Sequence, residues 1–456
     1  MADADLVLTS SRVVTPEGVR RAAIVVSGGT IASVETAAGL PRAARRVDAG
    51  DAAVLPGIID PHVHVNEPGR TEWEGFATAT RAAAAGGVTT IVDMPLNSVP
   101  VTTTVAALEA KARCAAASAL VDYGFWGGVV PGNLEELGPL HAAGVLGFKC
   151  FLAPSGIDEF RNIDPETLRR VMTRLAELRT VLLVHAEVPG PIAVGTHATH
   201  GGDPRRYSTY LATRPEAAER DAVELVLRVA EETGCAVHIV HLSSAKCVGP
   251  IAVWRAGGVP VSVETCPHYL TFAAEDIPDG ATEYKCAPPI RDSENRERLW
   301  IALRMRHLGI DLVASDHSPC PPGLKRRDSG SFLEAWGGIA SLELSLAAVW
   351  TGARARDLGL EDLARWLAAG PARLAGLEGR KGRIAPGHDA DLVVFDPDAS
   401  FTVDPARLHQ RHALTPYAGM TLSGRVRQTF LRGRCVYDRG TFAAAPVGRR
   451  LGHEAA

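Results

Sequence analysis

The sequence predicts an α/β fold, namely a (β/α)₈ barrel of the TIM type with a small β-sandwich built from both chain ends. Two observations favour this fold. Apolar strand-like segments alternate with helical stretches through the middle of the chain, and short β-branched runs separated by turns occur near each end. The length of 456 residues suits a large barrel with an appended module. We expect half-sandwiches in residues 1–54 and 376–456 and the barrel in residues 55–375.

The terminal segments have the texture of small sheets. Four short β-branched runs precede residue 35, and turn residues such as Ser27-Gly28-Gly29 separate them. Similar runs return after residue 382. Because each half is too small to be stable alone, the two halves are expected to assemble into one sandwich.

The central segment contains eight candidate strands, each followed by a helical stretch. Eight βα units in series are typical of a barrel whose chemistry lies at the C-terminal ends of its strands. The expected strands are residues 57–65, 89–95, 123–130, 145–152, 180–187, 235–243, 259–266 and 310–316. The expected helices are residues 71–85, 101–117, 134–143, 165–179, 215–233, 246–257, 293–308 and a last one from residue 338 onward.

Composition excludes several classes of partner. The chain has 48 Lys plus Arg against 52 Asp plus Glu, so no nucleic-acid surface and no polybasic membrane patch is indicated. We see neither a secretory signal nor a run long enough to span a membrane, and we expect a cytoplasmic protein. The eight cysteines form no C-x-x-C pair and are expected to be reduced thiols.

The run His62-Val63-His64 ends the first barrel strand. Side chains of a strand alternate with a period of two, so both imidazoles face the same interior. Two neutral imidazoles on one rigid face are suited to a divalent metal such as zinc. The alternative is that one is a core histidine and the other only marks the strand end.

Other potential ligands also fall at strand ends. His185, His241 and Asp316 close strands five, six and eight, and Lys149 lies within the apolar strand four. Histidine and aspartate are poor strand formers, and burying them unpaired is costly, which favours a metal site over core packing. His238 shares a strand with His241 at an odd offset, so we expect it to be structural.

Lys149 is the unusual member, because a protonated amine would repel a dication. Burial lowers the pKa of a lysine and frees its amine, which can add carbon dioxide and become an anionic carbamate able to bridge two metals. The alternative is a lysine that reaches the rim or pairs with a carboxylate. Spacing alone does not separate these possibilities.

Seven segments together resemble the allantoinases of the cyclic amidohydrolase family, and the resemblance covers nearly the whole chain. They are residues 60–76, 147–151, 265–269, 288–291, 315–322, 336–339 and 381–387. One departure is Ala-Glu-Val at residues 186–188, where relatives often carry Cys-Glu-Asn.

The resemblance implies two divalent metal ions. It implies that His62, His64 and Asp316 bind one ion, that His185 and His241 bind the other, and that carboxylated Lys149 bridges them. Zinc is the expected ion, with cobalt, iron or manganese as alternatives. It further implies a homotetramer that hydrolyses the hydantoin ring amide of allantoin to allantoate in purine catabolism.

Asp316 is the expected general acid–base, since it would neighbour the attacking water. Three further residues are candidate substrate contacts. Asn66 and Asn97 are candidate amide partners for a ureide. His317 either contacts the substrate or packs in its loop. Residues 325–330 are either a mobile flap or an ordinary surface loop.

Three alternative functions remain to be weighed. A dihydroorotase generally carries an arginine where this chain has Asn66, because its substrate bears a carboxylate. The segment at residues 66–74 argues against a dihydropyrimidinase or hydantoinase. A non-catalytic scaffold relative would usually lack ligands, whereas all six candidates are present here.

Overall fold

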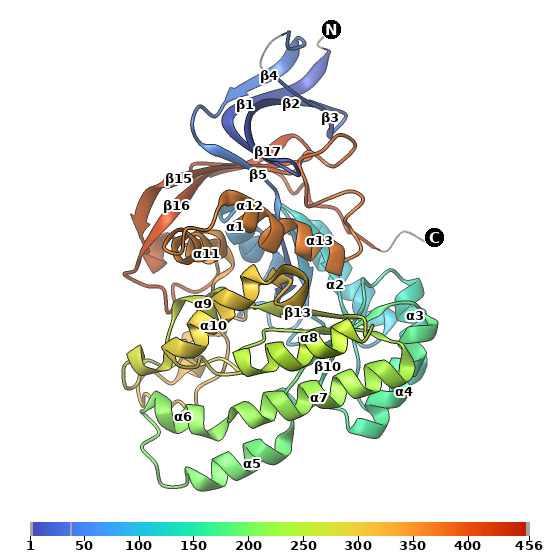
Figure 1. Cartoon of the computed structure of the whole chain (residues 1–456), viewed down its shortest axis with the longest axis vertical. Coiled ribbons are helices and arrows are strands. Elements are labelled where there is room, and N and C mark those ends of the chain that lie inside the picture. The colour runs from blue at the N-terminus through green and yellow to red at the C-terminus, as the bar shows by residue number, and fades with distance from the viewer. Residues whose placement is uncertain (1–2, 37–38, 453–456) are drawn as a thin grey trace.

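The computed structural model describes residues 3–36 and 39–452. The first two residues of the N-terminal half-sheet and the last four residues of the tail therefore lie outside it. The chain forms a mixed α/β structure in which strands from both chain ends lie together over one side of the central α/β segment (Figure 1). No helix of the described residues is long and apolar enough to cross a membrane.

The central strands are parallel and nearly completely buried. Trp126 divides the third predicted strand into two short segments, and its indole N–H donates to the Pro61 carbonyl over 2.7 Å. The central strands are β6 (Ile58–Val63), β7 (Val88–Asp93), β8 (Asp122–Phe125), β9 (Gly127–Gly128), β10 (Phe148–Phe151), β11 (Val181–His185), β12 (Ala236–Ile239), β13 (Val261–Thr265) and β14 (Leu312–Val313).

The predicted closed barrel is not present as one continuous sheet. The strands form a six-stranded sheet, β14-β13-β12-β11-β10-β9, and a three-stranded sheet, β6-β7-β8. Between the edges β14 and β6, the described residues make one isolated bridge, from Val63 to His317. At this edge the reason is local: β14 has only two residues, and Asp316 adopts a φ of +46°, which takes the chain out of the extended conformation.

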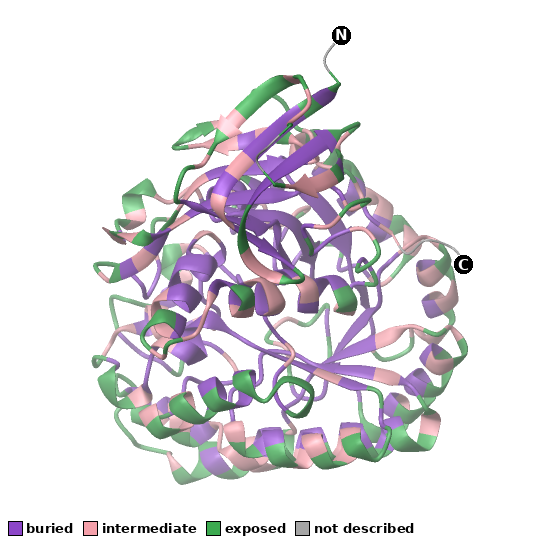
Figure 2. Cartoon of the chain, turned by 45° about the horizontal axis from the view of Figure 1, so that its top comes forward, coloured by how far each residue is buried: buried purple, intermediate pink, exposed green. Residues whose placement is uncertain are grey.

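Helices cover the central strands, with their exposed faces outward and their buried faces toward the strands (Figure 2). Helix α4 shows why they form. Asp164 caps it by accepting from the Thr167 N–H, Pro165 fits its first position, and Leu168, Val171, Met172 and Leu175 form one buried stripe. The first helices are α1 (Phe76–Ala85), α2 (Val105–Ser118), α3 (Leu137–Ala142), α4 (Pro165–Glu177), α5 (Pro189–Ala198), α6 (Tyr207–Thr213) and α7 (Glu216–Thr233).

The remaining helices are α8 (Val248–Ala256), α9 (Pro267–Thr271), α10 (Ser293–Arg304), α11 (Ser345–Arg354), α12 (Leu360–Ala364) and α13 (Gly370–Leu374). Helices α5 and α6 were not predicted. Helix α5 has only one buried residue, Gly195, so its sequence has no apolar stripe from which a helix could be inferred.

The two chain ends share one sheet, as predicted, but two facing sheets are not distinguished within the described ranges, so the sandwich is not confirmed. Nine strands pair, and β5 joins the halves through its antiparallel partner β15. They are β1 (Ala4–Thr15), β2 (Gly18–Ser27), β3 (Thr30–Glu35), β4 (Ala43–Asp48), β5 (Ala53–Pro56), β15 (Leu392–Thr402), β16 (Thr421–Leu431), β17 (Arg434–Asp438) and β18 (Thr441–Phe442).

A buried ionic cluster joins this sheet to the central strands. The Lys381 amine lies 2.9 Å from Asp122, 3.1 Å from Asp389 and 2.6 Å from Asp391. Arg432 also pairs with Asp122. We call these five residues the junction cluster. Since Asp122 begins β8 and Asp391 directly precedes β15, the cluster fixes the two parts of the fold to each other.

Candidate metal centre

The six predicted ligands lie at the carboxyl ends of the parallel strands. His62 is on β6, Lys149 on β10 and His185 on β11, while His64, His241 and Asp316 follow β6, β12 and β14 within a few residues. All six are buried, with at most 7% of their surface exposed. Carboxyl strand ends are where parallel α/β folds place their binding sites.

Three of these residues form one donor group. Nε2 of His62 lies 3.1 Å and Nε2 of His64 lies 3.5 Å from Oδ1 of Asp316. One potential ligand atom from each residue falls within 4.8 Å of the others. This spacing allows one ion to contact all three side chains.

The second group adjoins the first. Nδ1 of His185 and Nε2 of His241 lie 3.0 Å apart, and the ring centres of His62 and His241 are 5.4 Å apart. Phe151 stacks on His185 at 4.5 Å, and the Lys149 amine lies 5.1 Å from the same Phe151 ring. The five predicted histidine and lysine ligands and Asp316 thus surround one region.

Two glutamates that sequence reasoning missed orient the histidines. Glu264 accepts from Nδ1 of His62, and its other oxygen lies 3.0 Å from Nε2 of His238. Glu187 accepts from Nε2 of His185 over 2.8 Å and also pairs with Arg214. A glutamate within the buried strand β13 was the available signal, because a carboxylate there needs a partner.

These contacts decide which imidazole nitrogens remain available. In each ring, the nitrogen that faces a glutamate carries the proton. The other nitrogen, Nε2 of His62 or Nδ1 of His185, is then the one that would bind a metal. Burial, together with the positive charge of Lys149, lowers the pKa of His185 and His241 well below the usual range. Both rings are therefore neutral at physiological pH.

His62 shows that this region attracts positive charge. Burial would lower the pKa of His62, but Glu264 and Asp316 outweigh it and raise the pKa to about 9. Burial raises the pKa of Asp316 less than His62 and His64 lower it, so this carboxylate is ionised. A metal ion between the His62 and Asp316 atoms would replace the Nε2 proton that His62 holds in its absence.

Lys149 is buried without a polar contact. Its side chain is 0% exposed, and its amine has no hydrogen-bond partner within the described part of the chain. Burial lowers the pKa of Lys149 to about 8, although Glu264 and Asp316 act against it. The snorkelling and carboxylate-paired alternatives do not fit these contacts.

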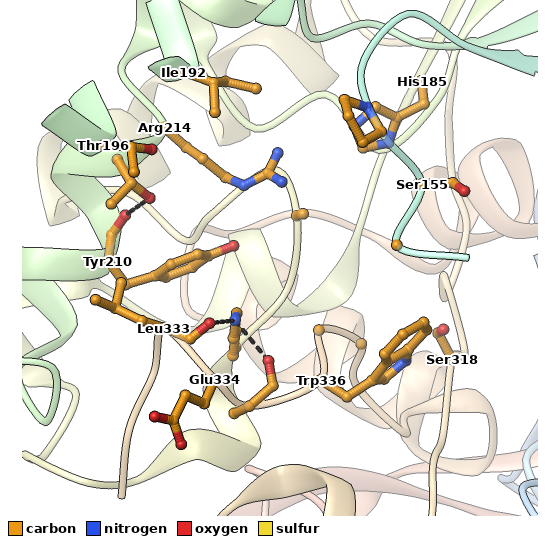
Figure 3. Close-up of a pocket in the computed structure, with 18 of the residues that line it drawn as sticks. Ser155, His185, Ile192, Thr196, Tyr210, Arg214, Ser318, Leu333, Glu334 and Trp336 are labelled. Atoms are coloured by element: carbon orange, nitrogen blue, oxygen red, sulfur yellow. Dashed lines mark hydrogen bonds between the residues drawn. The ribbon is translucent and has the colours of Figure 1, made fainter. Parts of the chain in front are cut away.

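The centre opens into a cavity of about 560 Å³, a size suited to a small molecule. Figure 3 shows Arg214 and Tyr210 on one wall, His185 and Ser155 across from them, and Trp336 beside Ser318. Lys285 also lines the cavity and donates to the carbonyls of Leu333 and Ala335. These groups line the same cavity as the histidines, so they belong to one site.

The three predicted substrate residues have different placements. Asn97 lines the cavity. Asn66 does not: its φ is +69°, it is fully buried, and its Nδ2 lies 3.5 Å from the Pro319 carbonyl. The predicted contact of Asn66 with substrate therefore has no support from its position, because the backbone turn places this side chain against a neighbouring loop.

His317 packs in its loop, which was one of its two predicted roles. Its Nδ1 accepts from the backbone N–H groups of Ser341 and Leu342, and its Nε2 lies 3.4 Å from Glu74. It is fully buried and does not line the cavity. Both ring nitrogens are thus used by the protein itself.

The segment at residues 325–330 is anchored at both ends. Lys325 is buried, and its amine donates to the carbonyls of Trp336 and Gly338. Arg205 donates to the Ser329 carbonyl over 2.6 Å. These contacts favour an ordinary loop over a mobile flap.

Comparison with known proteins places this geometry in context. The profile of the amidohydrolase family matches residues 53–436. The allantoinase of Streptomyces avermitilis is 52% identical over 455 residues, which cover 100% of both chains. The allantoinase of Saccharomyces cerevisiae is 46% identical, covering 87% of this chain and 86% of that protein.

Solved structures are also similar. The L-hydantoinase (dihydropyrimidinase) from Arthrobacter aurescens superposes with a TM-score of 0.94 at 31% sequence identity, covering 99% of this chain and 100% of that one. The similarity in sequence and backbone therefore extends over the whole chain, including the terminal sheet.

Proposed function

The chain belongs to the amidohydrolase family, and on this premise we propose that it hydrolyses the hydantoin ring amide of allantoin to give allantoate. The observation that carries the proposal is full-length similarity to allantoinases, which is greater than the similarity to hydantoinases of the same fold. The buried donor groups at the strand ends are consistent with it, because they suit a hydrolase that uses metal ions.

The donor set fits two divalent ions. His62, His64 and Asp316 would hold one ion, and His185 and His241 the other. A carbamate on Lys149 would bridge them, and the buried amine without a partner supports this assignment. Zinc is the proposed ion, because imidazole and carboxylate ligands suit it, and cobalt, iron and manganese accept the same donors.

When bound, the ions would lower the pKa of water so that hydroxide is available at neutral pH, and they would polarise the ring carbonyl. Asp316 takes the proton of the attacking water and returns it to the departing ring nitrogen. Glu264 and Glu187 keep His62 and His185 in the required tautomers. Asn97 offers an amide from the cavity wall for a polar group of the ureide.

Hydantoinase activity is the second candidate, because the superposition on the L-hydantoinase is close. Dihydroorotate is a poorer candidate, since its carboxylate needs a cation. Arg214 is already paired with Glu187, and the Lys285 amine is used by two backbone carbonyls.

The test is a comparison of substrates. One metal-loaded preparation is assayed with allantoin, hydantoin and dihydroorotate, and kcat/KM is measured for each. We expect allantoin to be preferred. Faster opening of hydantoin would favour the second candidate, and faster hydrolysis of dihydroorotate would overturn the assignment.

Four further features, namely two domains, the location in the cell and the assembly, belong to the same proposal. Residues 55–375 form the catalytic domain, whose strands are arranged as a (β/α)₈ barrel. Residues 1–54 and 376–456 together form a small β-sandwich domain. The protein works in the cytoplasm, without nucleic acid or membrane as partners. It assembles as a homotetramer, and sedimentation of the metal-loaded protein tests this assembly.

A further inference from the structure

A second group of potential metal ligands shares Asp316 with the first. Cys266 directly follows β13. His268 lies on the short helix α9, which begins at Pro267. One ligand atom each from Cys266, His268 and Asp316 falls within 4.8 Å of the other two. None of the roles assigned above uses Cys266 or His268.

His268 is the unusual member of this group. It is 0% exposed, and neither of its ring nitrogens has a hydrogen-bond partner in the described part of the chain. Its neighbour Tyr269 packs against the ring edge, with centres 4.2 Å apart, and uses its own hydroxyl on the Pro288 carbonyl. A buried imidazole with two unsatisfied nitrogens is costly unless something else binds it.

The donor types indicate what that partner is. A thiolate, an imidazole and a carboxylate together are a ligand set for a borderline or soft divalent ion, such as zinc, cobalt or cadmium. Cys266 is fully buried, and its thiol would release a proton to solvent when the ion binds. Magnesium and calcium prefer oxygen ligands and would not suit this group.

We propose that Cys266, His268 and Asp316 form an inhibitory site for a thiophilic divalent ion. Because Asp316 also belongs to the group with His62 and His64, an ion held by Cys266 and His268 draws this carboxylate away from the catalytic centre. The inhibitory effect rests on the proposed function, whereas the binding site does not.

Cobalt is the probe, because it reports sulfur ligation directly. The catalytic ligands contain only nitrogen and oxygen, so a thiolate-to-cobalt charge-transfer band in the near ultraviolet identifies an ion bound to cysteine. Metal-free protein is titrated with cobalt chloride while the band, the bound cobalt and the hydrolysis of allantoin are recorded. Variants Cys266→Ser and His268→Gln are titrated beside wild type. Cys247→Ser is the matched control, since Cys247 is equally buried but outside the group.

We expect the band in wild type and Cys247→Ser, with activity falling as the band grows. Cys266→Ser should lack the band and keep its activity in excess cobalt. His268→Gln should need about tenfold or more cobalt to show the band. A wild type without the band at any cobalt excess, or a band that persists in Cys266→Ser, overturns the inference.

The two proposals fail separately. Protein that shows the band but hydrolyses no allantoin at any cobalt concentration, including those too low to produce the band, refutes the proposed function and leaves the site intact. Protein that hydrolyses allantoin but never shows the band refutes the site alone. The wild-type titration decides this even if Cys266→Ser does not fold.

Discussion

Two buried clusters of ionisable side chains differ in where their positive charge comes from. In the junction cluster, Lys381 and Arg432 lie among three aspartates, and every one of these five side chains has an ionic partner. In the metal centre, the Lys149 amine has no such partner among the described residues, and His62 and Asp316 face each other across 3.1 Å.

The difference separates a structural cluster from a candidate functional one. Asp122, Asp389 and Asp391 lie as close together as metal ligands, but Lys381 already supplies their cation. At the strand ends the side chains are not paired in this way, because the Lys149 amine has no hydrogen-bond partner among the described residues. Buried charge without a partner is expensive, so it indicates a group that the protein must bind from solution.

The largest expected effect is on catalysis, from Asp316→Asn. The change removes a proton acceptor and weakens a ligand, so kcat/KM for allantoin should fall by about 10²–10⁴-fold. Asp389→Asn in the junction cluster is the control and should leave kcat/KM nearly unchanged. Equal losses in both variants would mean that the two clusters do not differ in function.

Lys149→Ala should abolish activity and lower the bound metal, measured by elemental analysis after dialysis. The physical reason is the loss of the proposed carbamate, which would hold both ions. Short carboxylic acids should restore part of the activity, because they supply two oxygens in the same place. Unchanged metal content would show that Lys149 does not bridge.

Lys381→Met should act on stability instead. Removing this amine takes away the positive charge that three buried carboxylates share, and the free energy of unfolding should fall by about 3–5 kcal/mol. Urea denaturation measures the loss. Lys149→Met is the matched variant, and it should cost less in the metal-free protein, because that amine has no ionic partner to lose. A reversed order would contradict the comparison.

Removing the metal should lower stability by a smaller amount. An ion present at about 100 times its Kd stabilises the folded chain by about 2.7 kcal/mol. Calorimetry before and after treatment with a chelator should show a lower Tm that returns when zinc is added. In Lys149→Ala the same treatment should change Tm less.

The last effect concerns pH. Burial, with Lys325 and Arg214 nearby, lowers the pKa of Lys285 from 10.5 to about 7. Between pH 7 and 10.5 the unfolded chain therefore holds a proton that the folded chain lacks, and the free energy of unfolding should rise with pH. Lys285→Met should flatten this rise in urea denaturation. An unchanged slope would show that Lys285 is not its source.

The local features of this protein were determined by the sequence alone. The period of two in His62-Val63-His64 and the apolar stripe of α4 each depend on a few neighbouring residues, so alternating strands and helices were correctly predicted. Helix α5 escaped prediction because it has only one buried residue, and α6 because it has only seven residues, too few to show a helical period.

Only the tertiary structure decided which buried polar groups meet. His62 and Glu264 are 202 positions apart, and Lys381 and Asp122 are 259 apart. The turn at Asn66 and the two-residue strand β14 likewise depend on packing between distant segments. The physical reason is that a buried polar atom must find its partner wherever the fold brings one, and that partner leaves no periodic trace in the local sequence.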